Sequence, residues 1–282
     1  MSKFFKMNSN NKSSRRRQAS KGNTSPSKNN FYKNYKKPPV KNSLSDNDGI
    51  RLNKFISNSG ICSRREADIY IEQGSVTVNG KLVTIMGYKV QKTDEVRFDG
   101  SLISPEKKKY VLLNKPKNYI TTMDDDRGRK TVMELVSNAA SERIYPVGRL
   151  DRMTTGLLLF TNDGELAKKL THPKHHVKKL YHASLDRKLS LKDLEKLRGD
   201  VIIEGRKVFI DEISYVEGQN KTEVGIEIHS GRNRIVRKIF EHVGYKVVKL
   251  DRVLFAGLTK KNLPRGRWRE LTKQELVNLQ MI

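Results

Sequence analysis

The sequence predicts an α+β protein with two folded units, and three observations lead to this fold class. Apolar residues at helical spacing, followed by an Asn-Gly turn, predict a small helical and hairpin unit near the N-terminus. The apolar run Leu157 to Phe160 lies between Gly156 and a polar turn, which predicts a buried strand. Strand and helix patterns then both continue to the C-terminus, so both kinds of element contribute to the core.

The composition indicates a polyanionic partner. The chain has 282 residues and a formal charge of +26, and nucleic acid is the commonest partner of such a basic protein. The single cysteine, Cys62, cannot form an internal disulfide or a multi-cysteine zinc site, which fits a reducing cytosol. No apolar run approaches the roughly 20 residues of a membrane helix, and the N-terminus turns polar too quickly for a secretory signal. We therefore expect a cytoplasmic protein without membrane contact.

Residues 1–48 are predicted to be a disordered basic tail. They are rich in Ser, Asn and Lys and hold 12 Lys and Arg against 2 Asp, so +10 of the net charge lies there. Such a segment buries too little apolar surface to offset the entropy lost on ordering. Aromatic and basic residues alternate in residues 31–37, which suits an RNA tether, and a solubilising extension is an equal alternative.

Residues 49–104 are predicted to fold as the first unit. Leu52 and Ile56 have helical spacing, and Ser63 with Glu66 forms a capping box at the start of a second helix. Gly74 ends that helix, and the strand that follows runs into the turn Asn79-Gly80, a strong hairpin signal. The result is a helix pair followed by a small sheet.

Residues 105–109 read as a polar linker, and residues 110–282 as the second unit. Strands are expected at 110–113, 157–160, 178–185, 208–216 and 222–229. Helices are expected at 164–170, after the N-cap Ser190, at 230–240 and after the capping-box residue Thr272. The helix at 230–240 is strongly basic.

Asp151 precedes the buried strand and is the main candidate for chemistry. An Asp in a loop often bonds nearby backbone N–H groups and only shapes a turn. A surface ion pair with Arg149 or Arg152 is a second structural alternative, of small energetic value. The residue types alone leave these alternatives open.

The motif around Asp151 resembles the signature of the Rsu family of pseudouridine synthases, which modify bacterial ribosomal RNA. It reads Gly148-Arg149-Leu150-Asp151, followed by Gly156 and a Leu-rich strand. The resemblance implies that Asp151 is the essential catalytic residue. It also implies a catalytic domain with a mixed, largely antiparallel sheet, flanking helices and Asp151 in a central cleft.

Two further motifs extend the resemblance over residues 49–282. Tyr181, after Lys179-Leu180, stands where the family places a Tyr that packs against the target base. Arg237, after Gly231-Arg232-Asn233-Arg234, matches the family arginine that lies beside the catalytic Asp. Ile235 replaces a Gln that many relatives carry, which leaves RNA contacts at this position open.

The first unit resembles the S-four RNA-binding domain, through Arg51-Leu-Asn-Lys54, Ser63-Arg-Arg-Glu-Ala67 and Gly74 to Gly80. Basic residues outside its apolar set are expected to contact phosphates. Together with basic residues of the catalytic motifs, the expected RNA-binding residues are Arg51, Lys54, Arg64, Arg65, Lys81, Arg149, Arg152, Arg232 and Arg234.

The reaction implied is the isomerisation of a uridine within RNA, with no cofactor and no metal. Neither Asp124-Asp125-Asp126 nor the histidines at 172, 175 and 176 have the arrangement of a metal site. The implied substrate is ribosomal RNA, namely the 23S RNA or a large-subunit assembly intermediate, bound by a monomer. The alternatives are 16S RNA as target and a non-catalytic ribosomal RNA-binding or assembly factor. A glycosidase-like hydrolase ranks last, because it would need two cooperating carboxylates.

Overall fold

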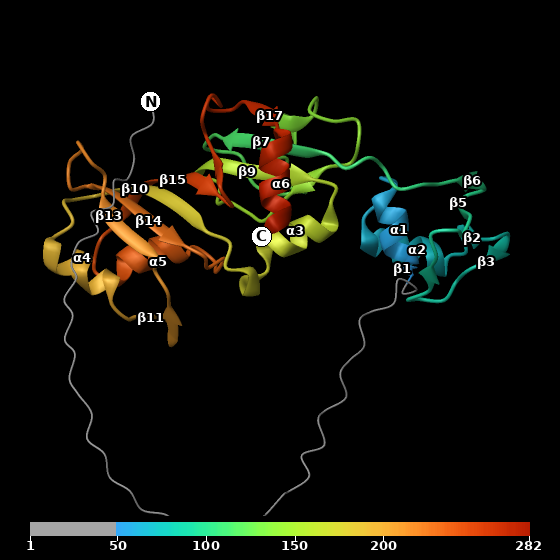
Figure 1. Cartoon of the computed structure of the whole chain (residues 1–282), viewed down its shortest axis with the longest axis horizontal. Helices are drawn as coiled ribbons and strands as arrows, with labels where there is room; N and C mark the ends of the chain where they lie inside the picture. Colours follow the sequence, from blue (N-terminus) through green and yellow to red (C-terminus); the bar gives the residue numbers. More distant parts are fainter. Residues whose placement is uncertain (1–48) are drawn as a thin grey trace, which may run out of the picture. The chain divides into compact units, whose positions relative to one another are not determined.

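The computed structural model describes residues 49–282 (Figure 1). The expectations of a disordered tail and an RNA tether concern residues 1–48 and lie outside the described residues. Helices and strands are both abundant, so the α+β fold class is confirmed. No helix in the described range is long and apolar enough to cross a membrane.

The first part of the described chain contains the predicted helix pair and small sheet. Its elements are β1 (Ile50–Arg51), α1 (Leu52–Asn58), α2 (Arg64–Glu72), β2 (Val76–Val78), β3 (Lys81–Leu82), β4 (Lys89–Val90), β5 (Val96–Phe98) and β6 (Ser101–Leu102). Ser63 and Glu66 form the predicted capping box at the start of α2. Asn79 and Gly80 both have positive φ, as a type I′ hairpin between β2 and β3 requires.

The second part of the chain, from residue 110 onward, contains more strands than the sequence patterns predict. Its strands are β7 (Tyr110–Lys115), β8 (Tyr145–Pro146), β9 (Thr155–Thr161), β10 (Lys179–Leu185), β11 (Val201–Ile203), β12 (Arg206–Val208), β13 (Glu212–Tyr215), β14 (Glu223–Ile228), β15 (Val247–Phe255), β16 (Leu258–Thr259) and β17 (Trp268–Glu270). Its helices are α3 (Gly164–Thr171), α4 (Leu191–Arg198), α5 (Ile235–His242) and α6 (Lys273–Met281), with short 3₁₀ turns at Glu134–Val136 and Pro173–His175.

A nine-stranded sheet organises this second part. The strand order along its main path is β13-β14-β10-β15-β9-β7-β17. Neighbours on this path pair antiparallel except β15 and β9, which run parallel through only two residue pairs, Asp251 with Thr155 and Arg252 with Gly156. The predicted mixed, largely antiparallel sheet is therefore confirmed, and its two halves meet at a short parallel seam.

Helices cover the two faces of this sheet. Successive residues of β9 point to opposite faces, as in any strand. Leu158 and Phe160 belong to a core that includes apolar residues of α4 and α5, whereas Leu157 and Leu159 belong to a second core with residues of α3 and α6. Figure 1 shows α6 in front of β7 and β9, with α3 near the lower end of α6. The all-apolar strand predicted at 157–160 is thus buried on both faces.

The predicted helix at 230–240 is wrong in its first turn. Residues 230–234 form a loop, and α5 begins only at Ile235. Arg234 precedes the helix with φ 50°, in the left-handed region that side chains other than Gly rarely adopt. The loop starts where β14 leaves the sheet and contains Gly231 and Asn233, both of which favour non-helical backbone. Its basic side chains are therefore presented from a loop.

Candidate active site

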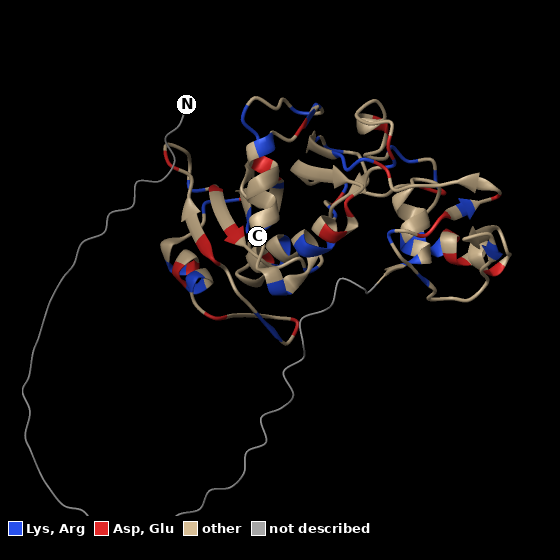
Figure 2. Cartoon of the chain, turned by 45° about the vertical axis from the view of Figure 1, so that its right-hand side comes forward, with Lys and Arg blue, Asp and Glu red and all other residues tan. Residues whose placement is uncertain are grey.

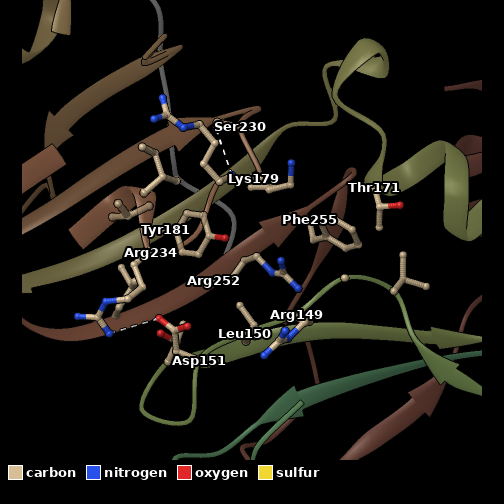
Figure 3. Close-up of a pocket in the computed structure, with 18 of the residues that line it drawn as sticks. Arg149, Leu150, Asp151, Thr171, Lys179, Tyr181, Ser230, Arg234, Arg252 and Phe255 are labelled. Atoms are coloured by element: carbon tan, nitrogen blue, oxygen red, sulfur yellow. Dashed lines mark hydrogen bonds and ion pairs between the residues drawn. The ribbon is translucent and has the colours of Figure 1, made fainter. Parts of the chain in front are cut away.

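A cleft of about 180 Å³ lies at the parallel seam of the sheet. The loop that contains Asp151 forms one wall, and residues of β10, β15 and the loop before α5 form the others (Figure 3). The lining residues are Val147, Gly148, Arg149, Leu150, Asp151, Thr154, Leu170, Thr171, Lys179, Tyr181, Ser230, Gly231, Arg232, Arg234, Ile235, Val236, Leu250, Arg252 and Phe255. The structure thus brings Asp151 and Tyr181 into one cleft.

Asp151 presents its carboxylate from a loop with a fixed backbone. The Thr154 N–H donates to the Asp151 carbonyl oxygen at 3.0 Å. On the preceding residue, the Leu150 carbonyl accepts a hydrogen bond from Thr121 Oγ1 at 2.8 Å. The Asp151 side chain is 38% exposed, and its Oδ2 lies 3.9 Å from Arg234 Nη1. The carboxylate is therefore available to a ligand while its backbone is held.

Lys115 is the main support of this loop and was missed as a functional residue in the sequence. Its side chain is fully buried at the end of β7. Its Nζ donates to the carbonyl oxygens of Thr154 (2.9 Å), Asp151 (3.2 Å) and Arg152 (3.3 Å), and to its neighbour Pro116 (3.1 Å). Burial lowers the pKa of Lys115 to about 8, and the nearby Asp151 carboxylate partly opposes this shift. The sequence did contain a signal for this role, because Lys115 continues the apolar pattern of a strand, and a lysine at such a buried position needs hydrogen-bond partners.

The direct ion pair expected between Asp151 and Arg237 is not formed among residues 49–282. Arg234 occupies that position, because the chain before α5 takes the left-handed turn described above. Arg237 instead donates from Nη1 to the Val247 carbonyl oxygen at 2.6 Å. Burial and the charge of Arg234 lower the pKa of Arg237, while the charge of Asp151 raises it. Both arginines therefore influence Asp151, and Arg234 is the nearer one.

Tyr181 belongs to both the core and the cleft. It lies on β10, opposite Ile226 of β14 and Arg252 of β15, and is 9% exposed. Its ring packs in the larger apolar core and also lines the cleft, where Figure 3 shows it facing the space above Asp151. Core packing and a contact to a base in the cleft are thus compatible for this side chain.

Two cations of the cleft were not identified from the sequence. Arg252 is only 3% exposed, and its Nε donates to the Leu157 carbonyl oxygen at 2.8 Å. Lys179 donates to the carbonyl oxygens of Val177 and His229, and burial together with the charge of Arg252 lowers its pKa to about 8. Lys179 appeared in a family motif only as a neighbour of Tyr181. Neither Lys179 nor Arg252 interrupts the strand pattern around it, so neither residue stood out in the sequence.

The predicted RNA-binding residues fall into three groups. Arg149, Arg232 and Arg234 line the cleft, whereas Arg152 is exposed on the same loop and does not line it. Arg232 also donates from Nη2 to the Ile203 carbonyl oxygen at 3.2 Å. The remaining group lies on the first part of the chain, at or near its surface: Arg51, Lys54, Arg64, Arg65 and Lys81. Figure 2 shows Lys and Arg along the helices and strands of both parts.

Family models match both parts of the chain. Residues 109–242 match the family described as RNA pseudouridylate synthase, and residues 50–96 match the S4 domain. These matches define the class of protein as an RNA-modifying isomerase with an S4 domain.

Individual relatives agree with this class. The ribosomal large subunit pseudouridine synthase B of Bacillus subtilis is 41% identical over 235 residues, which cover 82% of this chain and 96% of the relative. The dual-specificity RNA pseudouridine synthase RluF of Escherichia coli K12 is 37% identical over 233 residues, which cover 82% and 78%. The chain therefore belongs to the RNA pseudouridine synthase family, and the resemblance to its Rsu branch is confirmed.

A solved structure supports the same assignment. The crystal structure of a pseudouridylate synthase superposes with a TM-score of 0.57 and 28% sequence identity, covering 82% of this chain and all of that chain. The mixed sheet and its cleft are thus the fold of a pseudouridine synthase.

Proposed function

We propose that this protein converts a specific uridine of 23S ribosomal RNA to pseudouridine, with Asp151 as the catalytic residue. The observation that carries this proposal is the exposed Asp151 carboxylate, the only acidic side chain that lines the cleft of residues 49–282. The name of the Bacillus subtilis relative refers to the large ribosomal subunit, which supports 23S RNA as the target.

The target uridine must leave its stack to reach this carboxylate. Base flipping costs a few kcal/mol, which contacts inside the cleft have to offset. Tyr181 offers an aromatic surface to the flipped base, and the base is then close to Asp151. Arg234 and Arg149 are positioned to hold the flipped nucleotide or a neighbouring phosphate.

The reaction rearranges bonds within one nucleotide. The glycosidic C–N bond breaks, the uracil rotates, and a C–C bond forms to the same sugar, so no atom is gained or lost. Asp151 acts as a carboxylate that attacks the ribose or the uracil ring, or that removes a sugar proton. Arg234, whose Nη1 lies 3.9 Å from Asp151 Oδ2, offsets part of the negative charge of this carboxylate as the base excludes water.

RNA recognition is divided between the two parts of the described chain. Residues 49–104 act as the RNA-binding domain, through Arg64, Arg65 and the neighbouring basic residues, and residues 110–282 act as the catalytic domain. The protein acts as a monomer on ribosomal RNA or on a large-subunit assembly intermediate. Arg237, which donates from Nη1 to the Val247 carbonyl oxygen, adds positive charge near Asp151.

Mapping of pseudouridines tests the substrate. Unmodified 23S and 16S transcripts, and ribosomal subunits from a strain lacking the gene, would be incubated with the protein and mapped by carbodiimide treatment and primer extension. A new stop in 23S RNA alone supports the proposal, whereas a stop in 16S RNA alone transfers the activity to the small subunit. Binding of either RNA without any new stop would favour a non-catalytic assembly factor.

A further inference from the structure

The cleft contains a buried hydrogen-bond donor that the protein itself does not use. Arg252 Nη2 is fully buried and has no hydrogen-bond partner, although Nε of the same guanidinium is bound to Leu157. The guanidinium stacks 4.5 Å from the centre of the Phe255 ring, which fixes its plane. A buried donor without a partner costs free energy, so a ligand, an ion or an ordered water that accepts from it would be stabilising here.

A second cation lies beside this donor. Lys179 is opposite Phe255 in the pairing of β10 and β15, two residues along β10 from Tyr181, which faces Arg252. Two of the three protons of its ammonium group are used by the Val177 and His229 carbonyl oxygens. Its pKa of about 8 reflects burial next to the like charge of Arg252. An anion at this place would relieve that repulsion.

The residues that line the cleft carry an excess of positive charge. Among its lining residues in the described chain, one carboxylate, Asp151, faces five cations: Arg149, Lys179, Arg232, Arg234 and Arg252. Asp151 is already paired with Arg234. Figure 3 shows Arg149, Lys179 and Arg252 on the side of the cleft away from that pair. These three cations therefore lack an acidic partner within the cleft.

We propose that Lys179, Arg252 and Arg149 form a seat for an RNA phosphodiester, at the end of the cleft opposite the Asp151–Arg234 pair. This inference rests on the proposed function and deepens it: the flipped nucleotide is held by its backbone at one end while its base and sugar reach Asp151 at the other. A neutral uracil would use the free Arg252 donor but would leave the three charges unbalanced. A phosphodiester suits both the free Arg252 donor and the cluster of positive charges, because it accepts several hydrogen bonds and carries a negative charge.

Chemical labelling of Lys179 tests the seat at a single residue. At pH 8 an amine with a pKa of about 8 is roughly half unprotonated, compared with well under 1% for an ordinary lysine. The full-length protein would be acetylated at this pH with an N-hydroxysuccinimide ester, and modification of each lysine quantified by mass spectrometry. Lys178 is the internal control, because it is exposed and its pKa is raised by Glu227. We expect labelling of Lys179 well above that of Lys178.

Three ligands then identify what occupies the seat. Hexauridylate should protect Lys179 about tenfold, whereas its uncharged methylphosphonate analogue at the same concentration should not. Inorganic phosphate at equal phosphate concentration should protect less than twofold, since it lacks the base and sugar contacts. Equal protection by the methylphosphonate analogue would show that the base occupies this end, and equal protection by phosphate would show a free-phosphate site. Either result, or no protection by hexauridylate, overturns the proposal.

Variants assign the effect to the seat. Arg252→Lys keeps a positive charge but cannot bind Leu157 and a ligand together, and should remove most of the protection. Arg187→Lys, at an exposed arginine paired with Asp186, should leave it unchanged. Thermal unfolding confirms that both variants are folded. Protection of Lys179 is measured without turnover, so failure of the seat and failure of the isomerase activity are distinguishable.

Discussion

Lys115 Nζ lies 3.2 Å from the carbonyl oxygen of Asp151, and its side chain is completely buried. The same ammonium group binds the Arg152 and Thr154 carbonyls, so one side chain fixes the backbone on both sides of the proposed catalytic turn. A buried lysine is costly unless its donors are satisfied. Here backbone carbonyl oxygens accept the hydrogen bonds of the Lys115 ammonium group. Within the described part of the chain, the Asp151 loop is therefore held in place without an acidic side chain paired to this lysine.

Replacement of this lysine should disturb the Asp151 loop and the fold together. Lys115→Met keeps the length of the side chain and leaves the carbonyls of the loop without their shared donor. An unsatisfied buried acceptor costs about 1–3 kcal/mol, so we expect a loss of about 3 kcal/mol in the free energy of unfolding, with reduced turnover. Urea unfolding measures the first and pseudouridine formation the second. Lys117→Met, at an exposed position two residues away, is the control and should behave as wild type.

The same lysine predicts a dependence of stability on alkaline pH. The pKa of Lys115 is about 8 in the folded protein, against 10.5 in the unfolded chain. Between these values the unfolded chain binds more protons, so the contribution of Lys115 to stability rises with pH and is constant below pH 8. The difference in unfolding free energy between wild type and Lys115→Met should therefore grow from pH 7.5 to pH 9.5. A difference that shrinks over this range would show that the lysine gains, and does not lose, charge stabilisation on folding.

Gly156 lies at the parallel seam and should tolerate no side chain. Its φ is +107°, and an added Cβ would lie 2.2 Å from the Arg252 carbonyl oxygen and 2.5 Å from the Arg252 nitrogen. Gly156→Ala must push β9 and β15 apart, so we expect a loss of about 3 kcal/mol or more in unfolding free energy. Gly225→Ala is the matched control in the same sheet, because its nearest contact is 3.9 Å away. Equal stability of the two variants would contradict the close approach at the seam.

Arg234 and Arg237 should have separable roles. Arg234→Gln removes the nearer cation from Asp151 but no buried hydrogen bond, so kcat should fall about tenfold or more while the melting temperature stays unchanged. Arg237→Gln loses the charge-assisted bond to Val247, which should cost about 1.5–3 kcal/mol of stability. Thermal unfolding and single-turnover kinetics measure both effects. Unchanged turnover of Arg234→Gln combined with a large loss for Arg237→Gln would restore Arg237 as the direct partner of Asp151.

Local patterns predicted the elements whose residues determine their own structure. The capping box of Ser63 and Glu66 and the Asn79-Gly80 hairpin depend on contacts within a few residues, and both are confirmed. The buried strand with Leu157 to Phe160 was predicted because a short, wholly apolar run between Gly156 and a polar turn is typical of a strand buried on both faces. The start of α5 was placed too early, because helical spacing of apolar residues does not show where β14 ends.

The family motifs predicted more of the candidate site than the local patterns of apolar and polar residues did. Asp151 and Tyr181 belong to separate motifs, and both residues line one cleft. Rules that consider only neighbouring residues could not predict that these two side chains meet. Lys115 and Arg252 were missed as functional residues because their roles depend on the tertiary fold. Each side chain donates hydrogen bonds to backbone carbonyl oxygens of another strand or loop. The ion pair of Asp151 likewise depends on one left-handed residue, Arg234.

If Asp151 performs the chemistry and does not merely hold RNA, its loss should stop turnover without weakening RNA binding. The most direct measurement compares wild type with Asp151→Asn for pseudouridine formation and for RNA affinity on the same ribosomal RNA, with Asp126→Asn, an exposed carboxylate on another loop, as control. We predict that Asp151→Asn lowers the single-turnover rate at least about 10³-fold, with RNA affinity within about twofold of wild type, and that the control is unaffected. Turnover of Asp151→Asn near the wild-type rate would show that Asp151 is not the catalytic residue.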